Sequence, residues 1–297
     1  MPKFEDRETF SDRANAATTD MRKVFEITPL QRNDYLSSRY NSNIYLKRED
    51  LTPVRSYKLR GAFNSMRKMR GVSHFVCASA GNHAQGVAFM ASHFDVKATI
   101  YMPITTPQQK VSKTKIFGGK NIEIKLIGDY FDECLAAAEA FAIAENAYFI
   151  SPFDDADVIE GQGTVAVEIE QQLGFVPDRI IMPVGGGGLA SGITSFFGTT
   201  CHYSFVEPAG AASLKAALIA GQPKKLASLD NFTDGASVAR IGDRNFDALK
   251  NVSIEDVSII QENRICTTML EMLDVEGIVL EPAGALSIDV LKDISDE

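Results

Sequence analysis

The chain has 297 residues, of which 45% are hydrophobic and 23% are charged, and its net charge is −9. This length allows two domains with a sizeable core. The acidic balance offers no basic surface to nucleic acid or to anionic lipid, so we expect a small-molecule partner, no nucleic acid and no membrane.

The cysteine and histidine patterns favour neither a disulfide framework nor a zinc site. The four cysteines form no CxxC pair, and the four histidines form no HExxH pattern. The N-terminus is charged from its third residue, which is unlike a signal peptide. No run approaches the roughly 20 apolar residues of a membrane span. We therefore expect a cytoplasmic protein.

Taken in chain order, the sequence predicts alternating strands and helices. Residues 1–25 predict a polar helix that packs outside the core, and residues 130–145 give the clearest amphipathic helix. Segment 221–258 is rich in turn residues and predicts an irregular connection with short elements. The predicted strands are residues 43–49, 73–79, 97–102, 122–127, 147–151, 179–184 and 202–207. This order is typical of an α/β fold with mainly parallel sheets, whose ligands bind at the carboxyl ends of strands.

One such strand end carries four consecutive glycines, Gly185, Gly186, Gly187 and Gly188, followed by Leu189 and a predicted helix. Without side chains, this turn lets several N–H groups approach a ligand, and the helix N-terminus favours an anion such as phosphate. The structural alternative is a tight strand–helix turn that binds nothing. Four glycines in a row are destabilising, which favours the ligand.

The same turn also fits a dinucleotide-binding pattern. Gly185, Gly187 and Ala190 match G-x-G-x-x-A, and Glu207 ends the next predicted strand about 20 residues later. No GK[ST] follows, so the turn is not a P-loop. A nicotinamide-dependent dehydrogenase is therefore an alternative from a different functional class.

A second strand end carries the turn Ser79, Ala80, Gly81, Asn82 and His83. A hydroxyl, a side-chain amide and the N–H groups of a starting helix suit a carboxylate or a ring oxygen better than a pyrophosphate. The alternative is that the polar side chains only cap the helix. A histidine at a helix start is more often structural than a general base.

Lys58 stands between a polar turn and a predicted helix, directly after Tyr57. A partly desolvated lysine can form a Schiff base with an aldehyde. Any single lysine is most often a surface charge. Together with a phosphate-binding turn and an amide-bearing turn, however, Lys58 predicts pyridoxal 5'-phosphate as the cofactor.

These motifs resemble a known family. The segments "SYKLRGA", "SAGNHAQG" and "GGGGLASG" follow one another as in fold type II pyridoxal-phosphate enzymes, and the chain is most similar to the biosynthetic threonine dehydratases among them. The likeness covers nearly the whole chain. The sequence Lys58-Leu59-Arg60, in place of the K-D-R of cysteine and threonine synthases, favours the dehydratase–racemase branch. Further matching segments are Thr28–Leu30, Tyr45–Asp50, Asp234–Asp243 and Glu281–Ala285.

The resemblance implies a reaction and a set of site residues. L-Threonine would lose its α-proton to Lys58 and then its β-hydroxyl, giving 2-oxobutanoate and ammonia, with L-serine as a slower substrate. Lys58 and Tyr57 would contact the cofactor, Asn82 its ring hydroxyl, and Gly185–Gly188 with Leu189 its phosphate. The turn from Ser79 to His83, including Ala80 and Gly81, would bind the substrate.

Two departures from the family pattern narrow the reaction. Serine racemases of this family have a serine as second base where this chain has Ala80, whose methyl group cannot transfer a proton. They also bind a divalent cation with a glutamate matching Glu207 and a nearby acid, and Ser213 takes the place of that acid here. We expect no Mg²⁺ site, with Glu207 as a contact for a monovalent ion. A serine dehydratase or serine racemase of the same fold is the alternative.

The resemblance also implies a domain plan. Residues 1–58 and 154–297 would form a larger cofactor domain, and residues 59–153 a smaller mobile one. Both would be three-layer α/β/α domains with mainly parallel twisted sheets and the cofactor between them. The family forms dimers or tetramers, so a homodimer or homotetramer is expected.

The C-terminal end departs from the family as well. In the family, a strand after the helix of Glu281–Ala285 supplies the pyridine-nitrogen partner, and a regulatory domain follows. The chain ends at Glu297, before both, so we expect an open sheet edge, weak cofactor retention, low activity and no isoleucine feedback. A catalytically silent amino-acid-binding fragment is a further alternative.

Overall fold

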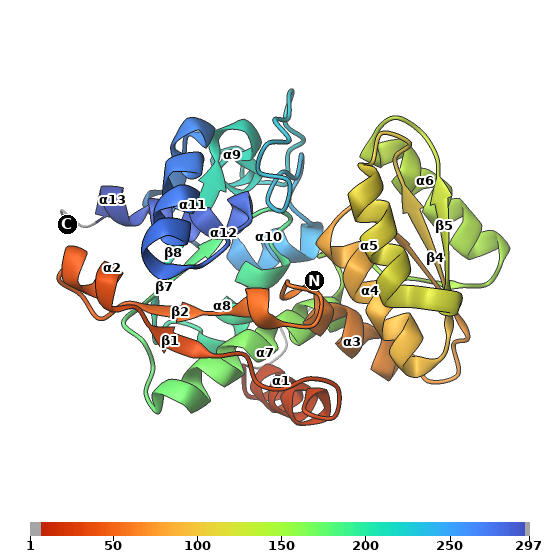
Figure 1. Cartoon of the computed structure of the whole chain (residues 1–297), viewed down its shortest axis with the longest axis horizontal. Coiled ribbons are helices and arrows are strands. Elements are labelled where there is room, and N and C mark those ends of the chain that lie inside the picture. The colour runs from red at the N-terminus through yellow and green to blue at the C-terminus, as the bar shows by residue number, and fades with distance from the viewer. Residues whose placement is uncertain (1–6, 295–297) are drawn as a thin grey trace.

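Two parallel sheets, each with helices on both faces, form the frame of the molecule (Figure 1). The computed structural model describes residues 7–294. All strand pairs within these two sheets are parallel, and a separate two-stranded pair is antiparallel. The α/β fold with mainly parallel sheets that the sequence predicts is confirmed.

The first sheet has the strand order β5-β4-β3-β6. Its strands are β3 at His74–Ala78, β4 at Lys97–Met102, β5 at Ile122–Leu126 and β6 at Tyr148–Phe149. Its helices are α4 at Asn82–Phe94, α5 at Gln108–Gly118 and α6 at Phe131–Ala144. The predicted helix over residues 130–145 is therefore α6.

Side-chain alternation along β3 explains the layers around this sheet. Phe75 and Cys77 pack with α4, whereas Val76 and Ala78 pack with α6. Successive residues of a strand point to opposite faces, so a strand that is apolar at both sets of positions must be covered on both sides. The continuous apolar run of β3 thus places helices on each face.

The second sheet has the strand order β7-β8-β9. Its strands are β7 at Arg179–Pro183, β8 at His202–Pro208 and β9 at Val257–Ile260. On one side lie α7 at Ala156–Leu173, α8 at Gly188–Phe197, α9 at Ser213–Ala220 and α10 at Asp243–Leu249. On the other lie α11 at Glu262–Glu276 and α12 at Pro282–Asp289, with α13 at Leu291–Ile294 following. Within residues 7–294, β7 pairs with β8 on one edge and has no partner strand on the other.

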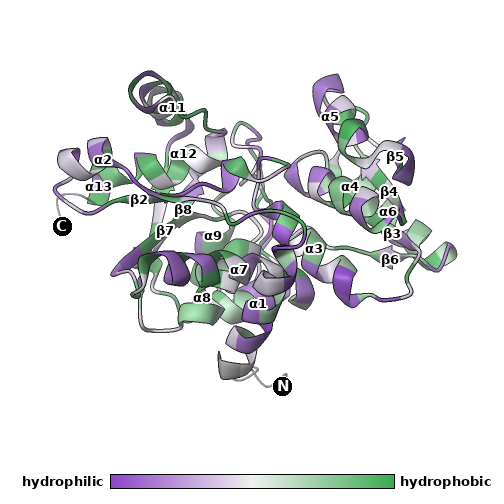
Figure 2. Cartoon of the chain, turned by 60° about the horizontal axis from the view of Figure 1, so that its bottom comes forward, coloured by the Kyte–Doolittle hydropathy of each residue, from purple (hydrophilic) through white to green (hydrophobic). Residues whose placement is uncertain are grey.

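The N-terminal part contributes α1 at Arg7–Met21, β1 at Leu30–Arg32, α2 at Asp34–Arg39, β2 at Tyr45–Lys47 and α3 at Lys58–Lys68. Helix α1 is largely hydrophilic (Figure 2), but it buries the stripe Phe10, Ala14, Ala17 and Met21. The expectation that this helix packs outside the core is wrong, because residues three to four apart share one helix face. Strands β1 and β9 lie outside the predicted strands.

Each predicted domain contains one of the two parallel sheets, but the sheets do not test where the domain boundaries lie. Strands β3 to β6 fall within residues 59–153, and β7 to β9 fall within 154–297. One apolar core nevertheless joins Met21, Phe25 and Val158 to the first sheet. The boundaries stay a prediction.

None of the helices in residues 7–294 combines the length and apolar character that crossing a bilayer requires.

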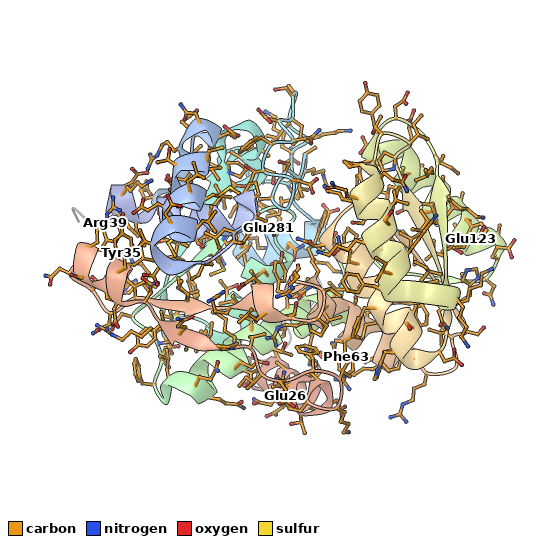
Figure 3. All side chains as sticks on the ribbon, in the orientation of Figure 1. Glu26, Tyr35, Arg39, Phe63, Glu123 and Glu281 are labelled. Carbon is orange, nitrogen blue, oxygen red and sulfur yellow. The ribbon has the colours of Figure 1, made fainter. Side chains whose placement is uncertain are left out.

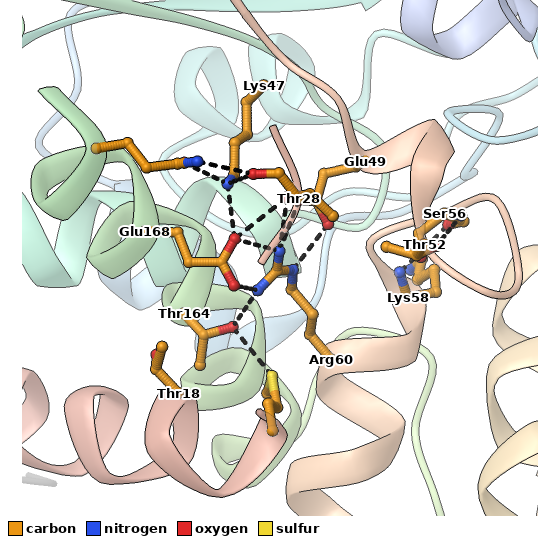
Figure 4. A network of polar contacts seen from close by, with 12 residues as sticks. Thr18, Thr28, Lys47, Glu49, Thr52, Ser56, Lys58, Arg60, Thr164 and Glu168 are labelled. Carbon is orange, nitrogen blue, oxygen red and sulfur yellow. Dashed lines mark hydrogen bonds and ion pairs between the residues drawn. The ribbon is translucent and has the colours of Figure 1, made fainter. Parts of the chain in front are cut away.

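A buried charge network joins α3, α7 and the N-terminal part (Figure 4). The Glu168 carboxylate on α7 is fully buried and accepts from Arg60 Nη1 and Nη2 at 2.8 Å each and from Lys47 Nζ at 2.6 Å. Burial alone raises the pKa of Glu168, but hydrogen bonds and charge from Arg60 and Lys47 outweigh it and lower this pKa to about 2. The network therefore works only with Glu168 ionised.

Glu168→Gln should lower the free energy of unfolding by about 3–5 kcal/mol at pH 7, because it leaves buried cations without their counter-charge. The pKa of Glu168 is about 2 when folded against a usual 4.5. Its stabilising contribution is therefore complete above about pH 4.5 and is lost as the pH falls towards 2. Urea unfolding at pH 7 and between pH 5 and 3 measures both effects.

The exposed neighbour Glu170 on the same helix gives the control, Glu170→Gln. This variant should unfold like the wild type at every pH. If Glu168→Gln keeps the acid sensitivity of the wild type over this range, the assigned contribution of Glu168 is wrong.

Candidate active site

Lys58 is the first residue of α3 and lines a cleft that residues of both sheet regions share. Its Nζ donates to the Pro152 carbonyl at 2.7 Å and lies 5.5 Å and 5.9 Å from the ring centres of Tyr57 and Phe153. Burial lowers the pKa of the Lys58 amine to about 8, although the Glu281 carboxylate acts in the opposite direction. A lysine in these surroundings is far more nucleophilic near neutral pH than a surface lysine.

The predicted substrate turn lines the same cleft. Ser79, Ala80 and Gly81 connect β3 to α4, and Asn82 begins that helix. Among the described residues no side chain caps α4, so its first N–H groups can serve a ligand. The Asn82 amide donates to both Glu281 oxygens, at 3.0 and 3.1 Å. Glu281 lies between the two halves of the molecule (Figure 3).

His83 belongs to this turn in sequence but its side chain is buried. Its Nε2 lies 3.1 Å from the Ile150 carbonyl. Burial, with a smaller contribution from the Lys58 charge, lowers the pKa of His83 to about 3. The ring is therefore neutral, and it holds the start of α4 against Ile150, which directly follows β6. A neutral ring brings no positive charge to a substrate carboxylate.

The glycine turn connects β7 to α8, where Gly187 precedes the helix at a φ of 95°. A Cβ on Gly186 would stand 2.3 Å from the Phe153 ring, and one on Gly187 would stand 2.8 Å from Asn245 Cβ. Gly185 and Leu189 line the cleft. No side chain in residues 7–294 caps α8, so its N-terminus, which attracts anions, remains for a ligand.

Glu207 is already engaged and does not face the cleft. Its fully buried carboxylate accepts from the backbone N–H groups of Leu214 and Lys215, at 2.7 and 3.0 Å, and so caps α9. Burial raises the pKa of Glu207 to about 7, with these N–H groups opposing the rise. The expected monovalent-ion contact has no support here. Within residues 7–294 no cluster of three or more His, Cys, Asp or Glu is arranged to hold a metal ion.

Several residues that line the cleft or lie directly behind it escaped the sequence reasoning. Phe153 lies against the glycine turn, and Asn245 donates to the Gly186 and Phe153 carbonyls at 2.8 and 3.0 Å. Phe153 follows β6, so the rule that ligands meet strand ends could have drawn attention to it. Glu281 stood in a matching segment, but nothing in the sequence placed it beside Asn82, 199 positions away.

Residues 22–297 match the family model described as "Pyridoxal-phosphate dependent enzyme". The chain belongs to this family. The predicted cofactor, pyridoxal 5'-phosphate, is thereby confirmed, and the nicotinamide alternative is wrong. The dinucleotide-binding pattern would need the Glu207 carboxylate to accept from a ribose hydroxyl, but that carboxylate caps α9 instead.

Among curated relatives, the chain is 47% identical over 289 residues to "L-threonine dehydratase biosynthetic IlvA" of Lactococcus lactis, covering 93% of this chain and 68% of that protein. It is 46% identical to the protein of the same name from Bacillus subtilis, covering 95% and 68%. Among solved structures it is similar to threonine deaminase isoform 2 of Solanum lycopersicum, with a TM-score of 0.87 and 35% identity over 97% of this chain and 85% of that one.

Gly186→Ala should lower the melting temperature and weaken cofactor binding, because its Cβ would meet the Phe153 ring at 2.3 Å. Adding Phe153→Ala removes the ring and should restore part of both losses, so the two substitutions should be non-additive. Differential scanning fluorimetry and absorption titration with pyridoxal phosphate measure these effects.

Gly284→Ala is the matched control, since its Cβ would make only an ordinary contact, 3.8 Å from Leu280. It should retain wild-type stability and binding. If the effects of the substitutions at Gly186 and Phe153 are fully additive, contact with the Phe153 ring is not the reason that position 186 requires glycine.

Proposed function

We propose that this chain is a pyridoxal-phosphate-dependent threonine ammonia-lyase that converts L-threonine to 2-oxobutanoate and ammonia, with L-serine as a slower substrate. This is the first step of isoleucine biosynthesis. The observation that carries the proposal is the desolvated Lys58 amine in a cleft that residues next to two uncapped helix N-termini also line, in a chain of this family. The names of the relatives above support the choice of threonine.

Each site residue has a role that its surroundings suit. Lys58 would bind the cofactor aldehyde covalently, with Tyr57 beside it. The N-terminus of α8, with Gly185–Gly188 and Leu189, would hold the phosphate. When bound, the cofactor supplies an electron sink that stabilises the negative charge left on the substrate after proton removal.

Substrate binding falls to the start of α4. The turn of Ser79, Ala80, Gly81 and Asn82 would receive the substrate carboxylate on free N–H groups, while neutral His83 keeps the helix in place. Because the Nδ2 of Asn82 is fixed by Glu281, its Oδ1 is the atom left for a cofactor or substrate donor. Fixed groups of this kind lower the cost of orientation.

Lys58 is also the group that moves the α-proton. Its amine, with a pKa of about 8, accepts a proton near neutral pH far more readily than an ordinary lysine. The Pro152 carbonyl gives the amine a fixed direction. The β-hydroxyl then leaves as water, and another water releases ammonia, so no net water is consumed.

The proposal extends to assembly and motion. Residues 1–58 with 154–297 and residues 59–153 would act as two domains that close over the substrate, in a cytoplasmic homodimer or homotetramer. The exposed ion pair between Lys110 of α5 and Asp234, at 2.5 Å, spans the cleft and would break on opening. Light scattering after size-exclusion chromatography tests the oligomeric state.

Lys58→Ala should abolish the absorption band of covalently bound cofactor and reduce 2-oxobutanoate formation to background, because it removes both the attachment point and the base. Lys113→Ala removes an exposed lysine of the same cleft and should leave band and product intact. Product from L-threonine and L-serine is measured by keto-acid assay, and D-serine by chiral chromatography. Turnover in Lys58→Ala, or D-serine as the main product, would contradict the proposal.

The rate at which borohydride traps pyridoxal phosphate on Lys58 should rise with pH through about 8, since only the free amine attacks the aldehyde. Glu281→Gln removes a negative charge that raises the pKa of Lys58, so the profile should move to lower pH. Peptide mass spectrometry across a pH series measures both. A midpoint near 10.5 in the wild type would refute the desolvated amine.

A further inference from the structure

Arg60 lies two residues after Lys58 on α3, and its guanidinium is fully buried. Its Nε and Nη2 donate to the two Glu49 oxygens at 2.7 Å each, and its Nη1 and Nη2 donate to the two Glu168 oxygens at 2.8 Å each. The planar fork is thus held by a carboxylate on each of two edges. Such paired contacts fix direction as well as distance.

The partners of Arg60 come from separate parts of the chain. Besides the carboxylates, Nη1 donates to Thr164 and Nη2 to Thr28, both at 3.1 Å. Thr164 and Glu168 belong to α7, whereas Thr28 and Glu49 flank the β1–β2 pair (Figure 4). The guanidinium therefore ties the start of α3 to two elements at once.

Other contacts also hold α3. Asn64 donates to the Asp157 carbonyl and Lys68 to the Asp157 carboxylate, at 2.7 Å each, and these anchor the later turns of the helix.

The first turn packs closely against its neighbours. A Cβ on Gly161 of α7 would stand 2.5 Å from the Arg60 carbonyl, and one on Gly86 of α4 would stand 3.1 Å from the Lys58 carbonyl. The first turn of α3 is thus packed closely against α7 and α4, and a Cβ on Gly61 of α3 would likewise meet the Gln162 side chain of α7 at 2.3 Å. At its N-terminus, the Ser56 hydroxyl accepts from the Lys58 N–H at 3.2 Å.

Helix geometry couples the position of the Lys58 amine to the position of the Arg60 guanidinium. Consecutive residues are about 100° apart around a helix, so these two side chains leave α3 about 200° apart, on nearly opposite faces. Rotating the helix by about 10° moves an atom at its roughly 6 Å rim by about 1 Å. Holding the Arg60 face therefore fixes the position of the Lys58 amine in the cleft.

We propose that Arg60 is a positioning residue, which holds the Lys58 amine in line with the Pro152 carbonyl and with the cofactor aldehyde. This inference rests on the chemistry proposed above for Lys58. Arg60 touches neither substrate nor cofactor and acts only through the rotation of α3. Phe153, next to Pro152, packs against the glycine turn. Holding the Lys58 amine at the Pro152 carbonyl therefore also fixes its position relative to the proposed phosphate site.

Arg60→Lys is the decisive variant, because an ammonium keeps the charge but cannot form the planar fork. We expect kcat for L-threonine to fall on the order of 100-fold, as for a displacement of about 1 Å, with KM little changed. The rate of borohydride trapping of pyridoxal phosphate on Lys58, which needs no turnover, should fall as well.

Lys47→Met is the matched control. Lys47 is another buried cation that donates to Glu168, at 2.6 Å, but it lies on β2 and not on α3. It should cost at least as much thermal stability while leaving the trapping rate and kcat near wild type. Glu49→Gln, which weakens one side of the fork at a partly exposed partner, gives a milder variant with an intermediate trapping rate.

Wild-type trapping and kcat in Arg60→Lys would overturn the inference, as would an equal slowing by Lys47→Met, which would mean that loss of stability is the whole effect. If Arg60→Lys does not fold, Glu49→Gln decides alone: unchanged trapping refutes the positioning role. If the wild type makes no 2-oxobutanoate, the proposed function fails, and the trapping rates at Lys58 still test Arg60.

Discussion

The arrangement of this protein depends on one buried charge, the guanidinium of Arg60. Removing a charge from water is costly unless every donor finds a partner, and the carboxylates of Glu49 and Glu168 provide that compensation. Because the partners lie on α7 and beside the β1–β2 pair, the charge is stable only when these elements and α3 assemble together. The network thus ties the helix that begins with Lys58 to two other parts of the fold.

The two sides of the cleft are held together very differently. On the side of α3, buried glycine contacts and paired carboxylates make a rigid junction. Across the mouth, the contacts are polar and exposed: Asn82 with Glu281, Lys110 with Asp234, and Lys225 with Asp132. Exposed ion pairs contribute about 0–1 kcal/mol each, so the contacts across the mouth hold its two sides far less strongly than the buried network holds α3.

Local patterns predicted much of this from the sequence. Strands such as β3 and β7 were recognisable because apolar runs end in glycine-containing turns, and these strand ends do meet in one cleft with Lys58. Long-range pairings were beyond such patterns. Nothing local places Glu281 beside Asn82, and the buried stripe of α1 is masked by the many polar residues around it. The short strands β1 and β9 depend on tertiary pairing rather than on their own sequence.

Packing gives the glycine turn a reason that is independent of any ligand. The sequence predicts that four glycines make room for a ligand, yet Gly186 is required by the Phe153 ring and Gly187 by its positive φ and by Asn245. Packing alone would select these residues. What points to an anion is the uncapped N-terminus of α8, since Gly185 and Leu189 on either side of it line the cleft that Lys58 also lines. The glycines let that helix end pack closely against Phe153, and the neighbouring Pro152 carbonyl accepts from the Lys58 amine.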